Sequence, residues 1–249
     1  MKVKYFDLIN KKIFISGGAD GIGSSIVEHF CEQGAEVIFI DINEKKAKEL
    51  IKNIKKKKFN LPKFFKCNVL NIKKLQKIIH EYGPFDTLVN NAGNDQRHSI
   101  NEITQKYFKN RFDTNLKHYF FSAKAVKKGM IKNNGGSIIN LSSICWIRGA
   151  PGFILYSSAK SAIFGLTRSL ARELGKYNIR VNSVSPGSIA TERQVKLWLK
   201  PKLKKEIKSL QSLNKQLMPK DVSSMVLYLA SDVSSGCTKQ NFIVDAGIT

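Results

Sequence analysis

The stretch KIFISGGADGIG, residues 12–23, joins a short apolar run to a glycine turn, and a helical pattern follows it. The apolar run is typical of a strand buried in a parallel sheet. Glycines in such a turn let the backbone come close to a pyrophosphate at the N-terminus of a helix. The spacing is G-x3-G-x-G rather than G-x-G-x-x-G, so the context of strand, turn and helix supports the interpretation more than the glycines alone. The candidate dinucleotide-binding residues here are Gly17, Asp20, Gly21, Ile22 and Gly23.

The same alternation of apolar strands and amphipathic helices continues along the whole chain of 249 residues. It predicts an α/β protein with a doubly wound Rossmann fold, a single domain (residues 1–249) around a central seven-stranded parallel sheet. The expected strands are 12–16, 36–41, 64–68, 87–90, 136–141, 180–185 and 241–244, and the expected helices are 22–33, 44–55, 72–82, 105–133, 155–175 and 221–230. Residues 192–217 interrupt this rhythm and are interpreted as a helical lid beside the site.

Asp41 ends the second expected strand, 18 residues beyond Gly23. An acidic side chain at about this distance binds the adenosine ribose hydroxyls and repels a 2′-phosphate, which favours NAD over NADP. The alternative is that Asp41 only caps the helix that begins near Glu44. Farther along, the turn from Asn90 to Gly93 lies at the carboxyl edge of the sheet, where open α/β folds bind ligands; Asn91, Ala92 and Gly93 are candidate cofactor contacts.

Ser143, Tyr156 and Lys160 form the candidate catalytic group. Tyr156 and Lys160 are four residues apart in an expected helix and therefore share one face. A tyrosine has a reference pKa of about 10, and a nearby ammonium group favours its phenolate form, which is a base. Ser143 follows the fifth expected strand and is placed to hydrogen-bond a reacting oxygen.

The composition adds a net charge of +23, in which 42 basic residues oppose 19 acidic ones. The basic residues are mostly lysines on expected solvent faces, whereas nucleic-acid readers rely on arginine and interleaved aromatic residues. We therefore expect no nucleic-acid partner. The N-terminus lacks the apolar core of a secretory signal and no run is long enough to span a bilayer, so a cytoplasmic protein without membrane contact is expected. The four separated cysteines indicate neither a metal site nor disulfides.

These motifs, in this order over essentially the whole chain, resemble those of the classical short-chain dehydrogenase/reductase family. The terminal residues 244–247 (VDAG) also fit the resemblance. It implies that Tyr156 is the general acid/base, that Lys160 lowers the pKa of Tyr156 and binds the nicotinamide ribose, that Ser143 orients the substrate oxygen, and that Asn115 supports a proton relay to Lys160. It also implies that Pro186, Gly187, Ile189 and Thr191 line the nicotinamide side.

One position departs from the family pattern. The family commonly has Asp-Val after the third strand, where this chain has Asn68 and Val69. An asparagine carbonyl can still accept a hydrogen bond from the adenine amino group, so we expect weaker but retained adenine contacts.

Within the family, residues 90–98, 115–121, 142–146 and 194–198 are similar to aldose 1-dehydrogenases of the D-xylose or L-arabinose type. A polar loop at residues 94–98 suits a substrate with several hydroxyls, and an indole ring packs well on the apolar face of a sugar. Loops are polar in general, however, and a tryptophan can equally be a core or interface residue. His98 is given no catalytic role. The candidate substrate residues are Asn94, Asp95, Trp146 and Arg193.

The leading hypothesis is therefore NAD-dependent oxidation of an aldose at C1 to an aldonolactone. The alternative with the same chemistry is a reductase of 3-oxoacyl thioesters or other ketones. A third possibility, a cofactor-bound regulatory protein that binds nucleic acid or acidic lipid, is disfavoured by the intact catalytic group. The resemblance implies a homotetramer formed through the two long helices at 105–133 and 155–175, whose apolar residues Tyr119, Phe120, Phe121, Ile163 and Phe164 are compatible with an interface.

Overall fold

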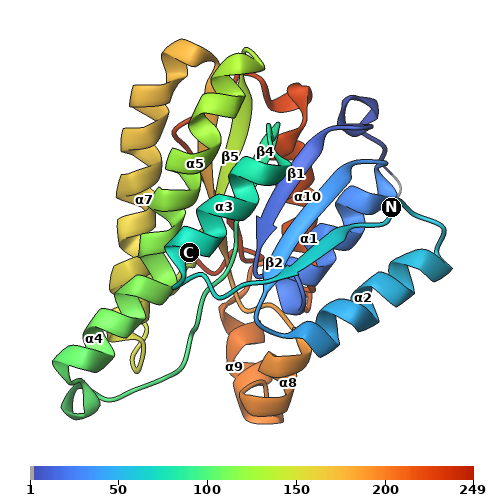
Figure 1. The fold of residues 1–249 in the computed structure, drawn as a ribbon. Helices are drawn as coiled ribbons and strands as arrows, with labels where there is room; N and C mark the ends of the chain where they lie inside the picture. The colour runs from blue at the N-terminus through green and yellow to red at the C-terminus, as the bar shows by residue number, and fades with distance from the viewer. Residues whose placement is uncertain (1–2) are drawn as a thin grey trace.

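A parallel sheet of seven strands forms the centre of the molecule (Figure 1). The structure is a computed structural model and describes residues 3–249. The strands lie in the order β3-β2-β1-β4-β5-β6-β7, and every pairing is parallel. Their bounds are β1 (Lys12–Ser16), β2 (Glu36–Asp41), β3 (Lys63–Lys66), β4 (Thr87–Asn90), β5 (Gly136–Leu141), β6 (Ile179–Pro186) and β7 (Asn241–Val244). The predicted Rossmann architecture is confirmed.

Helices cover both faces of the sheet (Figure 1). Side chains of α1 (Gly21–Glu32), α2 (Glu44–Lys56) and α10 (Pro219–Ala230) form one apolar core, and those of α3 (Ile72–Tyr82), α5 (His118–Lys132) and α7 (Ile154–Leu174) form the other. Strand β1 contributes to both cores. Because successive side chains of a strand point to opposite faces, Ile13 and Ile15 join the first core and Phe14 joins the second. This two-sided burial explains why the strand is continuously apolar.

The helix predicted at residues 105–133 is interrupted, and this prediction is corrected. Helix α4 (Gln105–Phe112) and α5 are joined by a π-helical turn (Asp113–Lys117). In a regular α-helix the carbonyl of Arg111 accepts the backbone N–H four residues on, whereas here it accepts the side-chain amide of Asn115 at 2.9 Å. Such wide turns often occur at functional sites.

One strand and one short helix also differ from the prediction by more than a small shift of their ends. Strand β3 spans Lys63–Lys66 instead of 64–68, because Asn68 already belongs to a turn in which its side-chain oxygen accepts the N–H of Leu70 at 2.9 Å. The short helix α6 (Cys145–Arg148) was not predicted.

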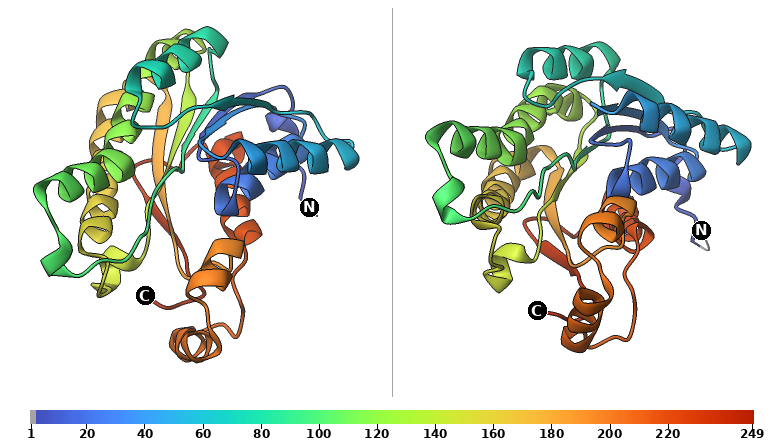
Figure 2. Two further views of the ribbon diagram at one scale, coloured as in Figure 1. Left: turned by 60° about the horizontal axis from the view of Figure 1, so that its bottom comes forward. Right: turned by 90° about the horizontal axis from the view of Figure 1, so that it is seen from below.

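The segment at residues 192–217 is partly helical. It contains α8 (Glu192–Leu197) and α9 (Pro201–Leu210), which project beyond the sheet edge at which the strands end (Figure 2). Its last residues, 211–217, are irregular. Within residues 3–249, no helix combines the length and the hydropathy needed to cross a bilayer.

Candidate active site

The predicted site segments come together at the carboxyl edge of the sheet. The strand order reverses between β1 and β4, and in open α/β folds ligands bind at this switch point. The glycine turn follows β1, the Asn91–Gly93 turn follows β4, Ser143 follows β5, and Pro186 ends β6.

The glycine turn has the geometry that a pyrophosphate requires. Gly17 and Gly21 have φ angles of +68° and +58°, a region that favours glycine. A Cβ atom on Gly23 would lie 1.8 Å from the carbonyl oxygen of Gly17, so only glycine fits there. The carboxylate of Asp20 accepts the N–H of Gly21 at 2.8 Å and caps α1. The turn therefore fits a dinucleotide, whose phosphates would face the first amides of α1.

Asp41 ends β2, hydrogen-bonds to the glycine turn and is not the N-cap of α2. Its two carboxylate oxygens accept the N–H groups of Ala19 and Asn43, each at 2.9 Å. The N-cap of α2 is Asn43, whose side chain accepts the N–H of Lys46 at 3.1 Å. The capping alternative for Asp41 is therefore wrong, and its carboxylate lies beside the glycine turn.

The turn after β4 packs directly against the glycine turn. The side-chain amide of Asn91 donates to the carbonyl of Gly17 at 2.8 Å, and the hydroxyl of Ser16 accepts the N–H groups of Asn91 and Ala92 at 3.1 and 3.2 Å. A Cβ atom on Gly93 would lie 3.1 Å from the Asn115 side chain and 3.5 Å from Lys160 Nζ. Gly93 thus lies between the glycine turn and the catalytic group.

The remaining candidate cofactor residues are spread around this edge. Thr191 caps α8 and lies beside Gly21, because a Cβ atom on Gly21 would be 3.3 Å from the Thr191 methyl group. Gly187 packs closely on Asp245, since a Cβ atom on Gly187 would lie 2.7 Å from that side chain. The structure gives three other candidates roles in the fold. Val69 and Ile189 are buried in the core, and the side-chain oxygen of Asn68 accepts the N–H of Leu70.

Ser143, Tyr156 and Lys160 meet at the centre of the site. Lys160 is 2 % exposed, and its Nζ lies 5.6 Å from the ring centre of Tyr156. Burial raises the pKa of Tyr156 well above its usual value, while a hydrogen bond from Ser143 lowers it. Burial also lowers the pKa of Lys160 to about 7, and the nearby Asp95 carboxylate opposes this shift. The lysine can therefore carry a charge near neutral pH and favour the phenolate of Tyr156.

Buried hydrogen bonds hold α7, and with it Tyr156 and Lys160, in place on the sheet. The hydroxyl of Ser142 donates to the backbone carbonyl of Lys160 at 2.8 Å. Farther along α7, the Asn140 amide donates to the Thr167 hydroxyl at 3.0 Å, and Asn90 donates to Asn140 at 2.9 Å. This chain links β4, β5 and α7 and fixes the register of the helix.

Asn115 lies in the π turn and uses its side chain to hold the loop after Gly93. Its oxygen accepts the N–H of Asn94 at 2.7 Å, and its amide donates to the carbonyls of Asn94 and Arg111 at 3.2 and 2.9 Å. The Asn115 side chain therefore holds the loop after β4 in place, and its part in a proton relay stays a prediction.

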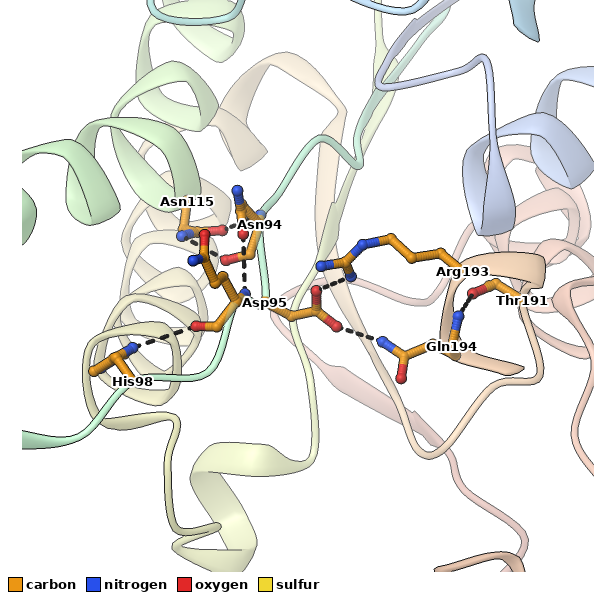
Figure 3. A network of polar contacts seen from close by, with 8 residues as sticks. Asn94, Asp95, His98, Asn115, Thr191, Arg193 and Gln194 are labelled. Atoms are coloured by element: carbon orange, nitrogen blue, oxygen red, sulfur yellow. Dashed lines mark hydrogen bonds and ion pairs between the residues drawn. The ribbon is translucent and has the colours of Figure 1, made fainter. Parts of the chain in front are cut away.

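A polar network closes the loop after β4 onto α8 (Figure 3). The Asp95 carboxylate binds Arg193 and Gln194 of α8, and Gln194 is in turn held at the start of that helix, where Thr191 accepts its N–H at 3.2 Å. Two predicted substrate residues, Asp95 and Arg193, are thus an ion pair. Gln194 completes the network, although it was not among the candidate site residues.

Aromatic contacts add to this closure. The Arg97 guanidinium lies 4.4 Å from the ring centre of Trp198, just after α8, and 5.2 Å from that of Phe153, just before α7. Trp146, the fourth candidate substrate residue, stacks on Phe164 of α7 with 6.0 Å between ring centres, so the protein occupies one face of its indole.

Two buried residues of α5 were not predicted to be parts of the site. Tyr119 and His118 are both 0 % exposed. Tyr119 contacts Lys160, and His118 Nε2 lies 3.1 Å from the carbonyl of Ala92. Burial lowers the pKa of His118 to about 3, so it is neutral. The expectation that Tyr119 and Ile163 face an interface is wrong, because both are internal, whereas Phe120 is 45 % exposed. One feature of the sequence pointed to Tyr119: it lies four residues, about one helical turn, after Asn115.

Across residues 3–249, no three His, Cys, Asp or Glu side chains are grouped so that they could hold a metal ion. The four cysteines are free.

A family model described as enoyl-(acyl carrier protein) reductase matches residues 17–249. The chain belongs to the short-chain dehydrogenase/reductase family. Among its relatives, a D-xylose 1-dehydrogenase of Caulobacter vibrioides is 41% identical over 98% of this chain and 97% of the relative. A probable galactose dehydrogenase of Rhizobium meliloti is 37% identical over 97% of this chain and 96% of the relative. A crystal structure of a 3-oxoacyl-[acyl-carrier protein] reductase from Brucella melitensis with bound NAD has a TM-score of 0.89 and 30% identity, covering 98% of this chain and 93% of that one.

Membership of the short-chain dehydrogenase/reductase family makes this protein an NAD(P)-dependent oxidoreductase that acts on CH–OH groups. Its substrate is a small molecule.

Proposed function

We propose that the protein oxidises the anomeric hydroxyl of an aldose to an aldonolactone, with NAD as cofactor. The observation that carries this proposal is the Asp95 network beside the catalytic group, since the Asp95 carboxylate acts electrostatically on both Tyr156 and Lys160. A polar wall at this place suits a ligand with several hydroxyls. Similarity to a D-xylose 1-dehydrogenase and a probable galactose dehydrogenase supports the same substrate class.

The residues divide the work as follows. The Tyr156 phenolate takes the proton of the C1 hydroxyl, and the Lys160 ammonium stabilises the phenolate before that transfer. Ser143 holds the C1 oxygen by a hydrogen bond while the C–O bond gains double-bond character. The chemistry that NAD supplies when bound is acceptance of the hydride from C1. The products are the lactone, NADH and one proton.

The glycine turn, Asp41 and the Asn91–Gly93 turn would hold the dinucleotide. The nicotinamide half would lie beside Tyr156, Lys160 and residues 186–191, and the adenine beside Asn68 and Val69. The proposed preference for NAD rests on Asp41, whose carboxylate lies against the glycine turn, where it would repel a 2′-phosphate.

The variant Asp41→Asn tests this preference. It keeps an oxygen that can accept the N–H of Ala19 but removes the charge. We expect the ratio of kcat/KM for NADP to that for NAD to rise by about tenfold or more, since relief of one like-charge contact is worth at least ~1.4 kcal/mol. Steady-state rates with both cofactors measure the ratio. Glu49→Gln, an exposed acidic residue within α2, is the matched control; an unchanged ratio in Asp41→Asn would contradict the role of Asp41.

The substrate class is tested by initial rates of NADH formation with pentoses, hexoses, a 3-hydroxyacyl thioester and a simple secondary alcohol, with NAD and NADP in parallel. Aldose-dependent formation of NADH is expected. Turnover of the thioester alone would favour the second candidate, a 3-oxoacyl-thioester reductase, which the family model and the Brucella melitensis structure support. In that case the Asp95 network would have a purely structural role.

We further propose a cytoplasmic homotetramer whose subunits meet through α4, α5 and α7, with residues 192–217 as a lid. The exposed rings of Phe108 and Phe120 on α4 and α5 support such an interface.

A further inference from the structure

A second phenol contacts the catalytic lysine. Lys160 Nζ donates to the hydroxyl of Tyr119 at 3.0 Å and to the backbone carbonyl of Leu141 at 2.6 Å. The Tyr119 hydroxyl in turn donates to the same Leu141 carbonyl at 2.9 Å. Tyr119 lies on α5 and Tyr156 on α7, and Lys160 Nζ lies 5.2 and 5.6 Å from the centres of the two rings.

This arrangement matters because Lys160 is buried. A buried ammonium group loses its hydration and remains charged only if protein acceptors replace the lost water. An ammonium group has three N–H donors. Tyr119 and Leu141 take two of them, which leaves the third for another partner, and the ring centre of Tyr156 lies 5.6 Å from Nζ.

The Tyr119 hydroxyl is poorly placed to transfer protons itself. Burial raises its pKa, so it keeps its proton. Its acceptors are the carbonyl of Leu141 and, at 3.5 Å, that of Ala92, and neither can pass a proton on. With 0 % exposure, the side chain has no direct contact with solvent. The contact therefore orients Lys160 and supports its charge without relaying protons.

We propose that Tyr119 is a positioning residue that holds the Lys160 ammonium group toward Tyr156 and keeps it charged. The inference rests on the catalytic roles proposed for Tyr156 and Lys160. It makes the π turn part of the active site, because that turn sets the direction in which Tyr119 leaves α5.

Other groups near Tyr156 and Lys160 also influence the pKa values that a pH profile would report. Asp95 from the loop after β4 and Cys145 from α6 act on both Tyr156 and Lys160, while Arg193 from α8 pairs with Asp95. His118, next to Tyr119 on α5, is neutral because burial lowers its pKa to about 3. Among the described residues, no hydrogen bond joins the Tyr119 hydroxyl to Asp95, Cys145 or Arg193, and it shares with His118 only the Ala92 carbonyl, at 3.5 Å.

The test is the pH profile of kcat for oxidation in Tyr119→Phe, with whichever substrate the wild type turns over. Loss of the acceptor lowers the pKa of Lys160, a less charged Lys160 raises the pKa of Tyr156, and the acidic limb moves to higher pH. We expect a shift of about half a pH unit to one unit, with rates that approach the wild type at high pH. Tyr228→Phe, which removes a remote phenol hydroxyl near Cys237, is the matched control and should show no shift.

A uniformly lower kcat with an unshifted profile would mean a purely structural role and would overturn the proposal. If Tyr119→Phe does not fold, Tyr119→Met lacks the same hydroxyl and fills the space flexibly, and the same shift is expected; failure of both to fold would also overturn the proposal. Inactivity of the wild type toward aldoses refutes the proposed substrate instead, and full activity of Tyr156→Phe refutes the shared catalytic roles.

Discussion

Tyr156→Phe is expected to lower kcat by about a thousandfold, within the range that a positioned general acid/base contributes. The substitution removes only the hydroxyl, and the ring of Phe fits the same space between Phe153 and Lys160. Binding of NAD should be nearly unchanged, because the glycine turn and Asp41 are on other elements. Initial rates and a fluorescence titration with NADH measure the two effects separately.

The control is Tyr177→Phe, which removes a phenol hydroxyl near the far end of α7. Its kcat should equal that of the wild type. Retention of full activity in Tyr156→Phe would exclude Tyr156 as the base. A joint loss of activity and NADH binding would instead indicate a damaged cofactor site.

Gly23→Ala should abolish detectable NAD binding and destabilise the fold. Its Cβ would lie 1.8 Å from the Gly17 carbonyl oxygen and 2.7 Å from Asn91 Nδ2, so the backbone of the turn would have to move. Overpacking of this kind costs about 3 kcal/mol, which corresponds to a fall in Tm of about 10 °C for a chain of this size. Thermal unfolding with and without NAD measures both effects, because a bound ligand raises Tm only if it binds the folded state.

Gly236→Ala serves as the matched control. No atom lies within 4 Å of the added Cβ there, and its φ angle is not in the left-handed region, so little change in Tm is expected. An NAD-dependent rise in Tm that persists in Gly23→Ala would show that the turn tolerates a side chain, and the pyrophosphate would then have to bind elsewhere.

Much of the fold was predictable because its determinants are local. The apolar run before Gly17 and its counterparts in β2, β4 and β5 encode buried parallel strands through their hydrophobicity, whereas the edge strands β3 and β7 are only partly buried. The glycine turn is likewise encoded by residues within one short segment. The short strand β3 was placed less well, since the turn at Asn68 depends on a side-chain hydrogen bond that composition does not reveal.

The site was harder to predict where it depends on long-range pairing. Asp95 and Arg193 were each expected near the substrate, but their pairing joins residues 98 positions apart in the chain. The role of Asp41 could be separated from helix capping only once Asn43 was seen to cap α2. The burial of Tyr119 was hard to predict, because the aromatic run around it shows no clear helical periodicity and only its spacing of four residues from Asn115 pointed toward the site.

The π turn between α4 and α5 also sets the phase of everything that follows it in the helix. Each residue of an α-helix turns the chain by about 100°, so one residue more or less in this turn would rotate α5 by about a quarter of a circle relative to α4. A deletion would bring the exposed Phe120 into the buried place of Tyr119, whereas an insertion would carry Tyr119 to the exposed place of Phe120. In either case Tyr119 would leave the position at which it contacts Lys160. A substitution in α5 therefore changes one side chain in place. An insertion or deletion at residues 113–117 turns the whole helix and changes which of its residues are buried.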